Sequence, residues 1–285
     1  MIKHLIISGG GYHVFNLLGM VYQLQKKNIY NIENIKTIYG VSAGAIIGTI
    51  LCLKMDMDDI LNYTINRPWN NDIKFEPNDI LNIFDKRGVF DINFMNIIFE
   101  KLLLSKNLSI DINLIDFYKY SNIDLHIFAV SCNNLELINF SYKTHPNLKL
   151  IHAIHMSSTL PFIFQPMFYN NTYMVDGGVL NKFPFDLCKE NNEEKLGILI
   201  KKNFKNIKEN SNLVTLYVSF LTNFIFYQNS KNYNEYGNNK NIIIYNAPFF
   251  NKNLLINLLN KKEIRKEQIE IGYGIVDNFI LNFKI

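Results

Sequence analysis

The sequence predicts an α/β domain built on parallel β-α-β units, and two stretches near its start carry that prediction. Residues His4–Ile7 form an apolar run of strand length, followed by three glycines and an apolar helical run at Val14–Leu24. Residues Ile38–Gly48 repeat this order of strand, turn and helix. Because parallel strands of such a unit end at one edge of the sheet, we expect the two turns to lie side by side.

The glycines Gly9, Gly10 and Gly11 allow three interpretations. A dinucleotide-binding fingerprint would need a further glycine where Val14 stands, which makes this interpretation weak. A plain tight turn is the second. The third is an oxyanion hole that serves Ser42, since bare backbone N–H groups can approach a developing negative charge.

The turn after the second strand places Ser42 between Gly40 and Gly44. This G-x-S-x-G pattern is typical of a nucleophile elbow, in which the serine occupies a strained turn and its neighbours must be very small. The helix that follows would aim its positive N-terminal end at an oxyanion. The alternative is a glycine-serine turn without chemistry.

The middle of the chain is expected to alternate between loops, helices and strands. Residues 60–82 are polar and are predicted as a loop. Apolar positions recur at helical spacing over residues 81–104, with a helix start at residues 91–93. Further predicted elements are a hairpin with strands at 124–131 and 135–141 and a short helix at 151–158.

A third informative stretch ends a predicted strand on Asp176, which is followed at once by Gly177 and Gly178. Asp-Gly is a common turn pair, so a hairpin corner is the simpler interpretation. The functional interpretation is that the glycines let this carboxylate come within hydrogen-bonding reach of Ser42.

The last third contains an uncharged stretch, residues 210–230, that is about as long as a bilayer span. Its polar side chains recur every three or four residues, which favours an amphipathic helix over a span. We expect its apolar side, with Phe220, Phe224 and Phe226, to pack against the sheet; the alternative is contact with lipid. A buried strand at 241–246 and a closing helix at 264–283 complete the prediction.

The three motifs together resemble the patatin-like phospholipase family, in order and in separation. Two further blocks are similar as well: residues 157–166, and Asn181 with Pro184 after the D-G-G motif. The resemblance covers residues 2–189 and continues loosely through 190–285, so a single domain of residues 1–285 is expected. The family pattern also has a basic residue and a glycine where this chain has His13 and Val14.

The resemblance implies a three-layer α/β/α sandwich with a mostly parallel central sheet. It also implies a lipid acyl hydrolase that uses a dyad, with Ser42 as nucleophile and Asp176 as its base, and needs no cofactor or metal. The implied oxyanion hole consists of the N–H groups of Gly9, Gly10, Gly11 and Ala43. Phospholipid or another acyl lipid would be the substrate, with contact at a membrane surface. The alternative is a lipid- or partner-binding protein on the same fold with impaired catalysis.

A Ser-His-Asp triad is the competing catalytic arrangement. In the α/β-hydrolase order the histidine follows the acid, but no histidine follows Asp176. A triad of an earlier acid such as Asp124 with His145 or His155 remains open at this point.

Composition sets the remaining expectations. The chain has 285 residues, of which 48% are hydrophobic and 19% charged, as in globular proteins with a large core. A net charge of +4 from scattered lysines does not indicate a nucleic-acid partner. Three cysteines without a C-x-x-C pattern indicate a reducing compartment and no zinc site. No secretory signal is recognised, so we expect a cytoplasmic location, possible also at membrane surfaces.

Overall fold

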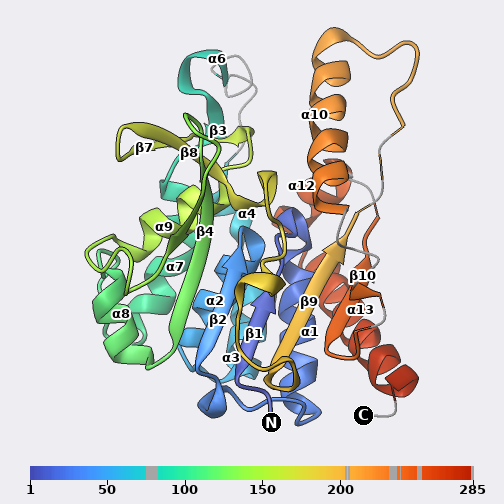
Figure 1. The fold of residues 1–285 in the computed structure, drawn as a ribbon. Coiled ribbons are helices and arrows are strands. Elements are labelled where there is room, and N and C mark those ends of the chain that lie inside the picture. Colours follow the sequence, from blue (N-terminus) through green and yellow to red (C-terminus); the bar gives the residue numbers. More distant parts are fainter. Residues whose placement is uncertain are drawn as a thin grey trace.

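The structure is a computed structural model that describes residues 1–74, 83–202, 204, 206–230, 236–237, 239–248 and 252–283. Within these residues, an eight-stranded sheet has the order β10-β9-β1-β2-β4-β8-β7, with β5 paired to β4 (Figure 1). Its parallel strands are β1 (His4–Ile7), β2 (Thr37–Val41), β4 (Asp124–Ser131), β9 (Lys195–Lys201) and β10 (Ile242–Asn246). Its antiparallel strands are β5 (Leu137–Phe140), β7 (Met167–Tyr169) and β8 (Thr172–Asp176). The predicted α/β fold with a mostly parallel central sheet is confirmed.

The strand register brings the three motifs together. Ile7 pairs with Gly40, so the glycine loop after β1 and Ser42 after β2 leave the same edge of the sheet. Val41 pairs with Phe128 of β4, and the next residue of β4, Ala129, pairs with Asp176. The antiparallel strand β8 therefore ends level with Ser42, although its sequence lies far from the first two strands.

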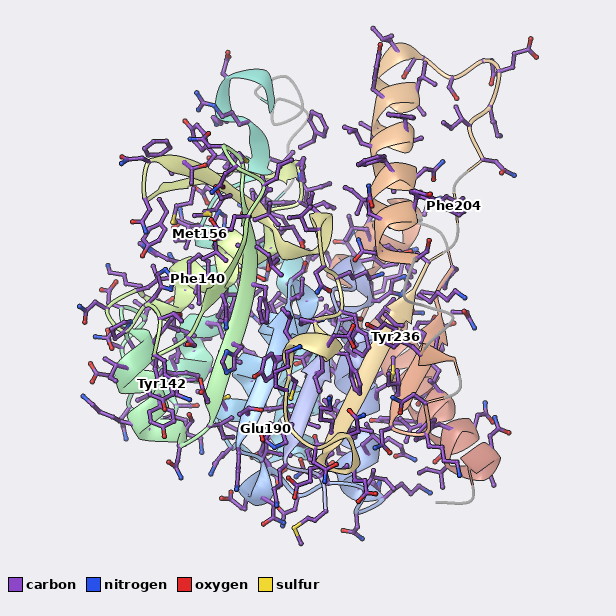
Figure 2. The ribbon with its side chains drawn as sticks, in the orientation of Figure 1. Phe140, Tyr142, Met156, Glu190, Phe204 and Tyr236 are labelled. Carbon is purple, nitrogen blue, oxygen red and sulfur yellow. The ribbon has the colours of Figure 1, made fainter. Side chains whose placement is uncertain are left out.

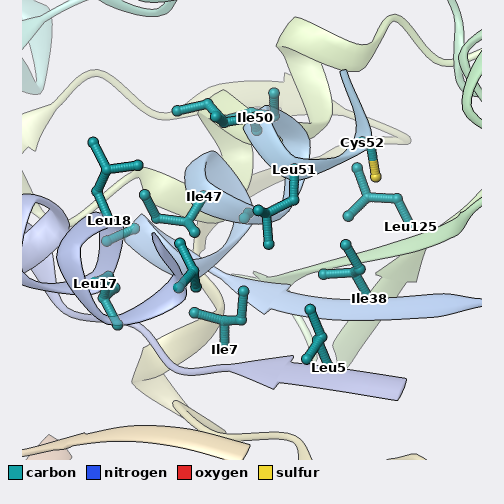
Figure 3. Close-up of a cluster of buried hydrophobic side chains, with 14 of the residues drawn as sticks. Leu5, Ile7, Leu17, Leu18, Ile38, Ile47, Ile50, Leu51, Cys52 and Leu125 are labelled. Atoms are coloured by element: carbon teal, nitrogen blue, oxygen red, sulfur yellow. The ribbon is translucent and has the colours of Figure 1, made fainter. Parts of the chain in front are cut away.

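Helices cover one face of the sheet and form the main core. Leu5, Ile7 and Ile38 point from the strands toward α1 (Val14–Lys26) and α2 (Ala43–Cys52), as Figure 3 shows. The sequence of α2 predicts this burial, because its residues are apolar on nearly all sides, and the helix is buried along most of its length. The same layer includes α3 (Met57–Asn66), α7 (Asn93–Leu104), α9 (Leu150–Ser158) and α13 (Lys262–Phe283), and α8 (Leu114–Ser121) and α12 (Lys252–Asn260) pack at its margins.

The opposite face is covered by the chain that follows Asp176. Ile6, Leu199 and Ile242 point to this side, where they contact Phe183, Phe185 and Tyr236; Figure 2 labels Tyr236 over the strands. This segment contains the 3-10 helices η3 (Gly177–Val179) and η4 (Phe185–Leu187). The chain that holds Asp176 therefore also supplies Phe183 and Phe185 to the cover of the second face, and Tyr236 joins them from a later segment.

Several predicted elements are confirmed, and three stretches differ. The hairpin of β4 and β5, the helix start near residue 93, and the strand ending on Asp176 are where the sequence predicts them. The helical spacing predicted for residues 81–104 is wrong at residues 88–90, which form the strand β3 (Gly88–Phe90). The loop predicted for residues 60–82 is wrong over its first part, which forms α3 and α4 (Trp69–Asp72). The side chain of Asp56 caps α3 by accepting hydrogen bonds from Asp58 and Asp59, a start signal that the polar composition concealed. Residues 75–82 of the predicted loop lie outside the described residues.

Helix α10 (Leu213–Ser230) forms as expected, but the prediction that it packs against the sheet is wrong. It extends away from the body beyond the carboxyl ends of the parallel strands (Figure 1). Its exposed large apolar side chains are Leu213, Leu216, Tyr217, Val218, Phe220, Leu221, Phe224 and Tyr227. No helix within the described ranges is both long enough and apolar enough to cross a membrane.

Candidate active site

Ser42 occupies a strained turn between β2 and α2. Its φ of 54° and ψ of −121° lie outside the regions that non-glycine residues ordinarily adopt. A Cβ atom at Gly44 would lie 2.1 Å from the carbonyl oxygen of Ile7, and one at Gly40 would lie 2.7 Å from the backbone of Ala45. Both flanking residues must therefore be glycine, as the elbow interpretation requires.

The elbow is held from a second side by α9. The backbone N–H of Ser42 donates a hydrogen bond of 2.9 Å to the hydroxyl of Ser157. Ser157 belongs to the family-like block of residues 157–166, but its sequence pattern does not predict this contact. The contact fixes the turn against α9 without using the hydroxyl of Ser42.

Asp176 lies next to this hydroxyl in a desolvated position. Its carboxylate accepts a hydrogen bond of 2.7 Å from the backbone N–H of Gly178. Asp176 is 6% exposed and Ser42 is 7% exposed. Burial raises the pKa of Asp176 to about 6, and the nearby Ser42 hydroxyl, the Gly178 N–H and two lysines only partly oppose this. A carboxylate with such a pKa is a better base than an exposed one and is still mostly ionised at neutral pH.

Close packing beneath the D-G-G turn sets the place of the carboxylate. A Cβ atom at Gly177 would lie 2.4 Å from the carbonyl oxygen of Phe128 on β4. The backbone N–H of Asp176 also donates to Thr159 at 2.9 Å. The turn is therefore held against β4 and the end of α9.

The glycine loop lies beside the nucleophile. A Cβ atom at Gly9 would be 3.5 Å from the Cβ of Ser42, and the N–H of Gly9 donates to the carbonyl of Lys182 at 3.0 Å. Gly11 has a φ of +60°, which suits glycine. The N–H groups of Gly10, Gly11 and Ala43 donate to no acceptor among the described residues. These three groups can therefore receive a negatively charged oxygen.

The structure does not assemble the alternative triads. Asp124 pairs with Thr37 at the amino ends of the strands, the opposite end of β2 from Ser42, and it binds Lys143. The Nε2 of His155 contacts the carbonyl oxygen of Gln165 at 2.8 Å. His145 contacts Thr144. Each of these groups has a structural partner away from the Ser42 hydroxyl.

His13 is buried, and its ring has a structural partner. Its Nδ1 pairs with Asn16 at 3.0 Å, and burial together with Lys202 lowers the pKa of His13 to about 4. The ring is therefore uncharged at neutral pH, and the glycine loop carries no positive side chain of its own at this position.

Two lysines near the site were not recognised from the sequence. Lys182 follows the D-G-G turn, and a Cβ at Gly9 would lie 3.6 Å from its Cγ. Lys202 follows β9, and a Cβ at Gly11 would lie 3.9 Å from its Nζ. The apolar run at residues 196–200 would have indicated β9, whose carboxyl end meets the same edge of the sheet, and thus Lys202 near the glycine loop.

Comparison with known proteins agrees with this geometry. The chain is 24% identical over 269 residues to a "Probable lipid hydrolase 463L" of Invertebrate iridescent virus 6, covering 91% of this chain and 83% of that protein. It is 28% identical over 211 residues to an "Uncharacterized protein R571" of Acanthamoeba polyphaga mimivirus, covering 73% of this chain and 67% of that protein. Among solved structures, VipD from Legionella pneumophila has a TM-score of 0.57 at 16% identity, covering 99% of this chain and 67% of that one, which shows a shared fold.

The family model described as patatin-like phospholipase matches residues 5–189. The matched region contains the glycine loop, the serine elbow and the D-G-G turn, the three segments that the strand register brings together. This chain belongs to the patatin-like phospholipase family.

Proposed function

We propose that the protein is a lipid acyl hydrolase of the phospholipase A or lysophospholipase type, acting through a Ser42–Asp176 dyad. The observation that carries the proposal is the position of the strained Ser42 beside the buried Asp176 carboxylate, whose pKa the Ser42 hydroxyl lowers. Family membership and the name of the iridescent virus relative support hydrolysis of a lipid ester as the reaction class.

In the first half-reaction, Asp176 accepts the hydroxyl proton while the Ser42 oxygen attacks the carbonyl carbon of an acyl ester. The carbonyl oxygen becomes an oxyanion, which the N–H groups of Gly10, Gly11 and Ala43 bind. Removing one such donor typically costs ~10²–10³ in rate. When the tetrahedral intermediate collapses, the alcohol leaves with the proton from Asp176, and the acyl group stays on Ser42. The N–H of Gly9 is already bonded to Lys182, so Gly9 serves by its close approach to Ser42 rather than as a donor.

In the second half-reaction, Asp176 accepts a proton from water, which attacks the acyl-enzyme. The intermediate expels Ser42, which takes the proton back, and a fatty acid is released. The hydrogen bond from the N–H of Ser42 to Ser157 keeps the elbow in place through both steps.

The test is release of fatty acid from phosphatidylcholine vesicles, followed by mass spectrometry. Ser42→Ala and Asp176→Asn should each abolish release, while His155→Ala, matched as a buried residue of the alternative triad, should retain it. Substantial release by Ser42→Ala would overturn the proposal. Lipid binding without turnover by the unaltered protein would instead favour a non-catalytic lipid-binding role.

Helix α10 is proposed as the part that contacts the lipid surface. Residues Leu213–Ser230 carry no formal charge, and exposed Phe and Tyr side chains are typical of helices at a membrane interface. The last turn of the helix meets the site, since Asn229 donates to Gly178 at 2.9 Å. A lipid surface bound by α10 would therefore lie close to the acyl ester site.

The surface proposal is tested with Phe220→Ser combined with Phe224→Ser. These changes should weaken sedimentation with phosphatidylcholine vesicles while hydrolysis of a short-chain monomeric ester continues. A matched pair of changes elsewhere is Leu135→Ser with Phe168→Ser, since both side chains are exposed and apolar. Equal effects of the two pairs on vesicle binding would count against a specific role of α10.

A further inference from the structure

Two lysine side chains lie beside the proposed nucleophile without a described carboxylate partner. No described carboxylate lies within 4.0 Å of the ammonium group of Lys182 or Lys202, and neither ammonium donates a hydrogen bond to a described residue. Lys182 is only 7% exposed, and a lysine this buried is ordinarily paired. A buried lysine without a carboxylate partner indicates a site to which an anion comes from outside.

The stem of Lys182 is part of the wall of the site. Its Cγ lies 3.6 Å from the Cβ position of Gly9, which is itself 3.5 Å from the Cβ of Ser42. Its backbone is fixed on both sides, because its carbonyl accepts from Gly9 and its N–H donates to Asn229 at 2.6 Å. The Nζ lies 5.9 Å from the ring centre of Phe226 on α10. The side chain thus runs from the nucleophile toward α10.

Lys202 approaches the same loop from the other side. Its Nζ lies 3.9 Å from the Cβ position of Gly11 and 5.6 Å from the ring centre of Tyr12. Each lysine interacts electrostatically with Asp176, and the charge of Lys202 also acts on Lys182. Burial lowers the pKa of Lys202 to about 8, so this side chain is still protonated at neutral pH. Burial and the charge of Lys202 lower the pKa of Lys182 well below its ordinary value, so an anion bound between the two lysines would favour the protonated form of Lys182.

From these contacts we infer that Lys182 and Lys202 form a binding site for the phosphate of a phospholipid substrate, next to the acyl ester site. The inference rests on the proposed function and names its substrate class. In a glycerophospholipid the phosphate and an acyl ester are carried by one glycerol, so both groups can occupy such adjacent positions. A phosphate diester has two free oxygens that share one negative charge, and each ammonium can donate to one of them. A neutral acylglycerol would leave both lysines unpaired, which disfavours its binding.

The test compares two lipids with the same acyl chain, a lysophosphatidylcholine and a monoacylglycerol. Binding is measured calorimetrically to the full chain carrying Ser42→Ala, so the result does not depend on turnover. Adding Lys202→Met should weaken binding of the lysophospholipid roughly tenfold or more, because a charge-assisted hydrogen bond is lost. The affinity for the monoacylglycerol should change far less. Lys208→Met is the matched control, an exposed lysine of the segment after β9.

Two further variants keep the test decisive. Lys202→Arg retains the charge and should retain most of the preference for the phosphorylated lipid. Lys182→Met should reduce the preference in the same direction, and thermal melting identifies any variant that fails to fold. Equal weakening of both lipids by Lys202→Met, or no weakening of either, would overturn the inference.

A competition arm separates the lipid phosphate from free phosphate. Inorganic phosphate at millimolar concentration should compete with the lysophospholipid and not with the monoacylglycerol. Binding of inorganic phosphate without any preference between the two lipids would overturn the head-group assignment. If the unaltered protein hydrolyses neither lipid, the proposed function fails. The binding preference between the two lipids still tests whether Lys182 and Lys202 form a phosphate site.

Discussion

The hydroxyl of Ser42 lies beside the carboxylate of Asp176 and lowers its pKa, and the two residues reach each other from strands of opposite direction. Ser42 leaves β2 at its carboxyl end, while Asp176 ends β8, which runs antiparallel to β4. The pairing of Ala129 with Asp176 stops β8 level with the serine turn. The register of β8 on β4 thus places the proposed base beside the proposed nucleophile.

The rate of ester hydrolysis should depend on the ionisation of Asp176. Only the carboxylate can accept the Ser42 proton, so kcat/KM should rise with pH through a midpoint near 6, the raised pKa of Asp176. Lys202→Met should move this midpoint upward, because the charge of Lys202 lowers the pKa of Asp176. A pH profile with a midpoint at the ordinary aspartate value near 3.8 would contradict this assignment.

Asp176→Asn should stabilise the fold while removing activity. The folded-state pKa of Asp176 is raised from 3.8 to about 6, so the fold binds this proton more tightly than the unfolded chain. Stability is therefore lost as pH rises from about 4 to 6, and the cost at neutral pH is roughly 3 kcal/mol. The variant should melt several degrees higher than the unaltered protein at neutral pH and show no advantage below pH 3.8. A variant that melts lower at every pH would refute the argument from burial.

Gly44→Ala should damage the elbow. Its new Cβ would lie 2.1 Å from the carbonyl oxygen of Ile7, so strand and helix must separate, at a cost of about 1–3 kcal/mol or more. Gly274→Ala is the matched control, because nothing lies within 4 Å of its Cβ position on α13. The control should be neutral or more stable by up to about 1 kcal/mol, as for glycine replaced in a helix. Equal stability of the two variants in chemical denaturation would contradict the close-approach argument.

Asn229→Ala should impair catalysis through the D-G-G turn. Asn229 donates to the carbonyl of Gly178 and accepts from the N–H of Lys182. Removing the Asn229 side chain therefore releases Gly178, whose N–H donates to the Asp176 carboxylate. We expect kcat on a monomeric ester to fall roughly tenfold, since each neutral hydrogen bond contributes about 1 kcal/mol. Ser230→Ala, which removes a contact within α10 only, is the control. Unchanged kcat in Asn229→Ala would show that the turn keeps its place without α10.

Local sequence patterns could predict the elements around Ser42 because the pattern and the packing agree there. An apolar strand, two glycines and an apolar helix leave few alternatives for Gly40–Gly44, and the structure requires both glycines. The parallel order of β1 and β2 likewise follows from their connection by a helix.

Other features were missed either because strands far apart in the sequence bring the residues together or because the local pattern was ambiguous. Lys182 and Lys202 lie in different segments, and only the pairing of β9 with β1 brings the second of them to the glycine loop. The exposure of α10 was missed because its apolar residues match those of a packed helix, and periodicity does not reveal what covers a face. The start of α3 was missed because its capping aspartates resemble a polar loop.

The dyad is tested most directly by labelling with a fluorophosphonate, followed by peptide mass spectrometry. We predict an adduct on Ser42 that is lost in folded Asp176→Asn, because the hydroxyl then has no base to accept its proton. An unmodified Ser42 in folded, unaltered protein, or equal labelling of the Asp176→Asn variant, would show that Ser42 and Asp176 do not form a catalytic dyad.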